Sequence, residues 1–208
     1  MLPATLPLFP LPNVVLFPNV FLPLHVFEPR YRAMVADALE GDRLIGIVLL
    51  RPGWEGDYEG RPAVYPIGCA GVITHHERLP DGRYNIVLRG LEKFRVVEEA
   101  PGRSYRVATI ETLHEPVPDG DREAVRAARR KLEALLVPQP TGRGADPKLP
   151  PAMSDDDLVN TLSQYMELEP LEKQALLERP GLLARCQSLI ELLEMKMIVS
   201  RSQWGRGH

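Results

Sequence analysis

Seven prolines fall within the first 30 residues, and apolar side chains fill most of the positions between them. A proline cannot donate a backbone hydrogen bond to a sheet, so these prolines confine the segment to edge strands, strand starts and turns. A disordered proline-rich segment would carry few apolar residues, whereas 44% of this 208-residue chain is hydrophobic. We therefore expect the segment to form short strands that contribute to a core.

Two hydrophobic periodicities divide the chain. Residues 1–118 show short strand patterns separated by Gly and Pro, interrupted by one amphipathic helix that Pro29 begins and Gly41 ends. Residues 119–208 show helical spacing, interrupted by a Pro- and Gly-rich connector at 137–152. The helices after the connector are expected to fold on one another as a small bundle. These patterns predict an α+β fold in two parts.

Local signals predict several element ends. Pro80, Asp81 and Gly82 supply the turn of a hairpin between strands at 68–79 and 83–89. Gly90 breaks the pleat of the second strand, as at a β-bulge, and a separate strand is expected at 94–98. Ser154 begins a helix by capping it.

Charge and cysteine content limit the class of protein. The chain carries 25 basic and 28 acidic residues, a net charge of −3, which argues against nucleic acid as a partner. The sequence contains no run of about 18 apolar residues that could span a membrane, and the N-terminus has no signal-peptide pattern. Cys69 and Cys186 show no metal-ligand spacing and are expected to be reduced, packed thiols. We therefore expect a cytoplasmic protein that does not associate with membranes.

The sequence contains no recognisable catalytic set. No Gly-Lys dipeptide is present, which excludes a Walker A phosphate loop, and no G-x-S-x-G elbow or lysine placed for a Ser-Lys dyad is found. The Cys and His residues that could bind zinc lack a recognised ligand spacing. We expect no enzymatic activity, no catalytic residue, no metal site and no cofactor.

The loop at 51–62 places Trp54 and Tyr58 among Gly, Glu and Asp residues. Large aromatic side chains on exposed loops can anchor a partner. Alternatively, both rings fold back on the sheet and cap the core. The sequence leaves both interpretations open.

Several segments together resemble one known family. They are LPLFPLPNVVLFPNVFLPLHVFEPRYRAMVADAL at 6–39, IGIVLL at 45–50, IGCAGVI at 67–73, RLPDGRYNIVLRGLEKFRV at 78–96 and EKQALLE at 172–178. The chain resembles the N-terminal substrate-binding domain of the Lon protease family, and it is also similar to the Lon-like region of cereblon. The resemblance implies a PUA-like, partly open β-barrel of about six strands with one short helix, followed by a C-terminal helical bundle.

The resemblance also implies a function. Such domains are thought to select unfolded or damaged polypeptide and to help the protease assemble. The full protease continues into an ATPase module and a Ser-Lys peptidase domain, whereas this sequence ends at His208. We therefore expect a stand-alone relative or an excised domain: a non-enzymatic polypeptide-recognition or adaptor module, related to proteolysis and protein quality control, even where the family name says ATP-dependent protease.

The predicted partners are unfolded or apolar polypeptide segments, together with a separate protease or a second copy of the chain. The alternative function is a small-ligand or RNA-binding PUA-like module. Within the motif, Phe27 and Tyr31 are expected to staple the helix start, and Glu28 to pair with Arg30 or Arg32. The candidate peptide-binding residues are His25, Phe27, Glu28, Arg30, Tyr31, Trp54 and Tyr58.

Overall fold

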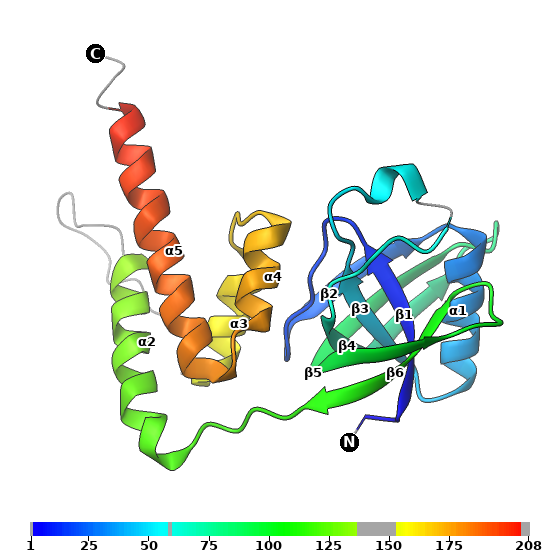
Figure 1. Ribbon diagram of the computed structural model, residues 1–208, viewed down its shortest axis with the longest axis horizontal. Coiled ribbons are helices and arrows are strands. Elements are labelled where there is room, and N and C mark those ends of the chain that lie inside the picture. The colour runs from blue at the N-terminus through cyan, green and yellow to red at the C-terminus, as the bar shows by residue number, and fades with distance from the viewer. Residues whose placement is uncertain (1, 58–59, 137–152, 205–208) are drawn as a thin grey trace. The chain divides into compact units, whose positions relative to one another are not determined.

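Five strands close into a ring, and a sixth lies at its edge (Figure 1). The structure is a computed structural model that describes residues 2–57, 60–136 and 153–204. Hydrogen bonding runs from β1 through β3, β4, β5 and β6 and returns to β1, whereas β2 pairs with β5. This partly open barrel confirms the predicted fold class. The strands are β1 Thr5–Leu11, β2 Phe21–Val26, β3 Leu44–Leu49, β4 Ile67–Arg78, β5 Tyr84–Ala100 and β6 Arg106–Leu113.

The prolines of the first segment occupy two kinds of strand. Pro23 lies in β2, which is an edge strand as predicted. Pro7 and Pro10 lie in β1, which has neighbours on both sides but is not paired on both sides along its whole length. β1 tolerates them because Pro7 lies in its β6-paired half and Pro10 in its β3-paired half, and the two halves overlap only at Leu8.

Helix α1 (Pro29–Glu40) begins at the predicted proline and ends before Gly41. Its buried side chains join barrel residues such as Phe9 and Leu88 in one hydrophobic cluster. α1 therefore supplies part of the barrel core. The buried residues of the helix are Tyr31, Met34, Val35 and Ala38.

Strand β5 is continuous over 17 residues, so the prediction of a separate strand at 94–98 is wrong. The bulge expected at Gly90 is confirmed by a register shift in the pairing of β5 with β4, between Cys69 and Gly71. A Cβ at position 90 would collide with the Phe17 carbonyl oxygen. Gly90 therefore permits close approach of the 15–20 segment, to which it is joined by hydrogen bonds with Asn19 and Val20.

The hairpin turn between β4 and β5 follows the prediction. Gly82 has a φ of 81°, a conformation that glycine adopts at no steric cost. The Asp81 carboxylate accepts a hydrogen bond from the backbone N–H of Arg83 at 3.1 Å. This short turn aligns the two longest strands of the ring.

The remaining elements are two short 3₁₀ helices and four α-helices, and none of the described helices is long and apolar enough to cross a bilayer. The 3₁₀ helices are η1 (Trp54–Asp57) and η2 (Asp119–Asp121). The α-helices are α2 (Arg122–Leu136), α3 (Asp155–Tyr165), α4 (Pro170–Glu178) and α5 (Gly181–Trp204).

The chain divides into two compact units. The β-rich unit comprises Met1–His114 and Asn160–Glu178, and the helical unit comprises Glu115–Val159 and Arg179–His208. α4 therefore belongs with the barrel. The periodicity had instead predicted that it packs in a bundle with the other helices after the connector. The predicted boundary between residues 118 and 119 stays a prediction, and the connector at 137–152 lies outside the described residues.

Two buried glutamines explain why residues 160–178 join the barrel. The Gln164 side chain accepts a hydrogen bond from the Phe17 N–H and donates one to the Val15 carbonyl. The Gln174 amide donates to the Ile67 carbonyl at 3.0 Å. These amides satisfy backbone groups that would otherwise be buried without partners.

Within the helical unit, α2 packs against α5. The Lys131 ammonium lies 2.8 Å from the Glu194 carboxylate, which joins the two helices. The Ser154 hydroxyl accepts a hydrogen bond from the Asp157 N–H at 3.1 Å, which confirms the predicted helix cap. The expected C-terminal helical region is therefore present.

Candidate functional site

Exposed aromatic side chains gather along strand β2. Phe21 is 50% exposed, Phe27 60% and Tyr165 62%. The Tyr165 hydroxyl donates a hydrogen bond to the Phe21 carbonyl oxygen at 2.8 Å, and the His25 ring stacks on the Phe27 ring with centroids 6.2 Å apart. We call these four residues, Phe21, His25, Phe27 and Tyr165, the β2 edge surface. Large exposed apolar side chains along one strand are typical of a binding surface.

Hydrogen bonds fix the His25 ring on this surface. Its Nδ1 lies 2.7 Å from the Asn85 side-chain oxygen, and its Nε2 lies 3.3 Å from Nη1 of Arg83. Because a guanidinium only donates, Nε2 is the acceptor and Nδ1 carries the proton. His25 is therefore held as a fixed platform beneath Phe27.

The backbone of β2 offers little to an added strand. Its free edge has lost one donor at Pro23, and the Phe21 carbonyl oxygen already accepts from Tyr165. A polypeptide that extends a sheet needs a row of open donors and acceptors. Binding here therefore depends on side-chain contact.

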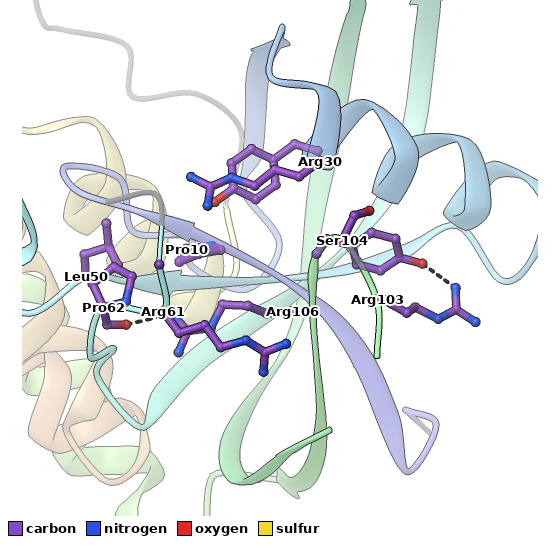
Figure 2. Close-up of a pocket in the computed structure, with 11 residues that line it drawn as sticks. Pro10, Arg30, Leu50, Arg61, Pro62, Arg103, Ser104 and Arg106 are labelled. Carbon is purple, nitrogen blue, oxygen red and sulfur yellow. Dashed lines mark hydrogen bonds between the residues drawn. The ribbon is translucent and has the colours of Figure 1, made fainter. Parts of the chain in front are cut away.

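A pocket of about 330 Å³ opens elsewhere on the β-rich unit (Figure 2). Its wall includes Pro10 of β1, Leu50 after β3, residues 60–62 and residues 103–106. α1 contributes Arg30 and Tyr31. We call it the arginine pocket, because Arg30, Arg61, Arg103 and Arg106 all line it.

Arg106 is the most buried of these arginines, with 10% of its side chain exposed. Its Nη1 donates to the Pro62 carbonyl at 2.7 Å, and its Nε donates to Glu99 at 2.8 Å. Arg61 also lies 3.8 Å from the Glu99 carboxylate. One carboxylate is thus shared by two guanidinium groups.

The other two arginines each have their own carboxylate. Nε of Arg30 donates to Glu28 at 3.0 Å, and Arg103 contacts Asp37 at 2.8 Å. The Tyr105 hydroxyl donates to the same Asp37 oxygen at 2.6 Å. Burial, followed by the hydrogen bond to Asp37, raises the pKa of Tyr105 above its usual value, so its hydroxyl remains a donor near neutral pH.

Tyr31 is one of two tyrosines that line the described part of the pocket, together with Tyr105. Its ring centroid lies 4.4 Å from that of Phe9, and the Arg30 guanidinium lies over the ring at 4.7 Å. Tyr31 is 3% exposed, so its ring is packed against its neighbours. Aromatic packing and a cation–π contact together orient Arg30.

No group of three or more His, Cys, Asp or Glu residues in the described ranges could hold a metal ion. Cys69 and Cys186 are both buried, as predicted. Burial raises the pKa of the Cys186 thiol from 9.0 to about 11, which favours the unreactive protonated form.

Comparison with known proteins decides the family. The family model for the ATP-dependent protease La (LON) substrate-binding domain matches residues 5–195. The chain belongs to this family. Lon protease 2 of Myxococcus xanthus is 32% identical over 94% of this chain, and a Lon protease of Anaeromyxobacter dehalogenans is 29% identical over 94%. This Lon substrate-binding domain spans about a quarter of their length, 24% of each.

Solved structures support the fold of this Lon domain. The Lon N-terminal domain protein from Xanthomonas campestris matches with a TM-score of 0.60 and 22% identity, over 90% of this chain and 97% of that one. The N-terminal domain of a Mycobacterium avium complex Lon protease matches with a TM-score of 0.66 and 15% identity, over 91% and 98%. These likenesses confirm the architecture that the resemblance implied.

The predicted site residues of the Lon domain separate into groups. His25 and Phe27 lie on the β2 edge surface, whereas Arg30 and Tyr31 line the arginine pocket. Glu28 pairs with Arg30, which is one of the two partners predicted for it. The motif therefore contributes to two different surfaces, one at the end of β2 and one at the start of α1.

Three predictions need separate comment. The staple of Phe27 on Tyr31 is wrong, because Phe27 is 60% exposed while Tyr31 packs on Phe9. Trp54 lies half-buried in η1. Tyr58 lies outside the described residues, so the choice between anchor and cap for this pair stays open.

Sequence reasoning missed Arg61, Arg103 and Arg106. These residues lie 31 to 76 positions after Arg30, and only the closed ring brings them to one pocket. Their proximity depends on the pairing of β1 with β3 and β6, and this long-range pairing has no local sequence signature.

Proposed function

We propose that this Lon substrate-binding domain is a non-enzymatic polypeptide-recognition or adaptor module that captures apolar segments of non-native chains. The exposure of Phe21, Phe27 and Tyr165 along one barrel edge carries the proposal. When a partner covers exposed aromatic rings, their apolar surface is removed from water, and this favours binding. The family description as a substrate-binding domain of a protease supports the same choice.

The geometry suits a partner without fixed structure. His25 and Tyr165 hold the ends of the surface by hydrogen bonds, so little ordering of the protein itself is required on binding. Because the β2 backbone is partly blocked, the bound segment is recognised by its apolar side chains. A separate protease or a second copy of the chain, in the cytoplasm, would then receive the captured polypeptide.

A binding experiment tests the proposal. Fluorescein-labelled casein, which lacks a folded core, is titrated with the chain and followed by fluorescence anisotropy. Phe27 exposes more than half of its side chain, and its truncation should weaken binding about tenfold. Phe21→Ala should act in the same direction with a smaller effect.

Val97→Ala is the matched control. Val97 is 62% exposed on β5 but lies outside the β2 edge surface, so its truncation removes exposed apolar area without touching the proposed site. Its casein affinity should equal that of the wild type. Equal affinities for Phe27→Ala and Val97→Ala, or absence of saturable casein binding at micromolar concentration, would contradict the proposal.

The arginine pocket favours a second candidate, a small-ligand or RNA-binding module. A pocket of about 330 Å³ with four guanidinium groups suits an anionic small molecule. The net charge of −3 opposes RNA, which requires a positive surface. Tight RNA binding that weakens steeply with added salt would place this candidate first.

A further inference from the structure

Outward-facing residues of β5 continue the β2 edge surface across the sheet. On β2 the exposed positions alternate with Leu22 and Leu24, which pack against the core, so the exposed side chains share one face. The β5 residues opposite them alternate with buried residues in the same way. The facing pairs are Phe21 with Arg89, Pro23 with Val87, and His25 with Asn85. A partner seated on the β2 edge surface therefore lies against β5 as well.

Arg89 is the charged member of these pairs. Its side chain is exposed, and its position opposite Phe21 places the two Cβ atoms about 4.5–5.5 Å apart. Its Nη2 lies 3.5 Å from the Asn19 side-chain oxygen, which is longer than a usual N–H···O hydrogen bond. The guanidinium group therefore lies near the start of β2, beside the exposed Phe21 ring.

Within the described part of the β-rich unit, the Arg89 guanidinium forms no ion pair with a carboxylate. β2 itself contains no acidic residue. Glu77 of β4 faces Asn85, which is four residues along β5 from Arg89, so the two positions are about 13 Å apart. This end of the β2 edge surface thus presents an aromatic ring next to a cation that Glu77 does not neutralise.

A partner that covers Phe21 also removes water from the neighbouring Arg89 guanidinium. A guanidinium has five N–H donors, and the contact with Asn19 uses one of those of Arg89. A carboxylate on the partner can accept from two others in parallel, whereas a second cation is repelled. The charge that accompanies the partner's apolar side chain therefore changes the affinity.

We propose that Arg89 determines the charge preference of the β2 edge surface. The surface takes apolar segments that carry an Asp or Glu side chain beside the apolar residue, and it disfavours segments with Lys or Arg there. This inference rests on the proposed function, because Phe21 and Phe27 supply the apolar contacts of the same segment. It narrows the partner to acidic, apolar polypeptide.

Three labelled peptides with blocked termini test the proposal. They share one apolar stretch with a central Phe and carry Glu, Gln or Lys on both sides of it, so the direction of binding does not matter. An exposed ion pair favours binding by up to about fivefold, and a like charge disfavours it by a similar factor. By fluorescence anisotropy, the Glu peptide should bind about tenfold more tightly than the Lys peptide, with the Gln peptide between them.

Three substitutions of Arg89 separate its charge from its shape. Arg89→Gln should remove the preference, and Arg89→Lys, which retains the charge, should preserve it. Arg89→Glu should reverse the order, so that the Lys peptide binds more tightly than the Glu peptide. Because Arg89 is exposed, the melting temperature should stay unchanged in all three variants. A gain in affinity for the Lys peptide cannot result from a loss of folding.

Arg95 supplies the matched control on the same strand. It is 50% exposed and pairs with Glu111 at 3.4 Å, outside the β2 edge surface. Arg95→Gln changes the net charge by the same amount as Arg89→Gln, yet it should keep the wild-type preference. Raising the salt from about 0.05 M to about 0.5 M should reduce the preference of the wild type, because salt screens exposed charges.

The outcomes separate this inference from the proposed function. If the three peptides bind the wild type equally, or if Arg89→Glu leaves their order unchanged, the role of Arg89 is refuted while polypeptide capture stands. Loss of the preference in Arg95→Gln as well would attribute it to net charge and would also refute that role. If neither the peptides nor casein bind, both proposals fail.

Discussion

Replacing Gln164 with Leu should destabilise the β-rich unit, and the structure permits an estimate of how much. Gln164 is 8% exposed, and its amide satisfies both the Phe17 N–H and the Val15 carbonyl. Leucine has a similar size but cannot form either hydrogen bond. The substitution therefore leaves two buried backbone groups without these partners.

Each unsatisfied group costs about 1–3 kcal/mol, so the lower bound for the pair is about 2 kcal/mol. For a chain of this length, about 2 kcal/mol lowers the melting temperature by roughly 4–8 °C. The effect should appear in the unfolding of the barrel, because residues 15–17 are buried against it.

Tryptophan fluorescence can report this transition. The chain contains Trp54 and Trp204, so a Trp204→Phe background leaves Trp54 as a probe of the β-rich unit. Gln187→Leu is the control, since Gln187 is exposed on α5 and its substitution should change stability by less than about 0.5 kcal/mol. A Gln164→Leu melting temperature within 2 °C of the control's would refute the role assigned to this side chain.

Two further changes probe the fold in different ways. Gly90→Ala should cost several kcal/mol or prevent folding, because the new methyl group meets the Phe17 carbonyl, and urea unfolding would measure the loss. A stability equal to wild type would show that the 15–20 segment yields. Because the Cys186 pKa is raised to about 11 in the folded state, the neutral thiol stabilises the fold below pH 9, and this contribution is lost as the pH rises through about 11. Cys186→Ala should flatten that fall in stability, whereas an unchanged pH slope would contradict the assignment.

Local signals predicted those elements whose cause is local. Pro29 and Gly41 delimit α1, and the Pro80–Gly82 turn joins the two long strands, because both features depend on backbone preferences of the residues themselves. The continuity of β5 through Gly90 escaped prediction. It depends on the approach of Phe17, which is distant in sequence.

The candidate site was predictable only in part. The motif around His25 to Tyr31 could be recognised as one stretch, and it does reach both the β2 edge surface and the arginine pocket. Arg61 and Arg106 could not be found, because their roles follow from ring closure and a shared contact with Glu99. Likewise, helical periodicity showed that α4 has a buried face but not that Ile67 of the barrel lies against it.

Site-specific crosslinking tests the central claim most directly, namely that the β2 edge surface captures non-native polypeptide. The photoreactive amino acid benzoylphenylalanine is placed at position 27 in one protein and at position 97 in another, both at exposed sites on the β-rich unit. Irradiation with labelled casein should give a crosslinked product from position 27 and little from position 97. Equal crosslinking at both positions, or crosslinking from position 97 alone, would contradict the claim.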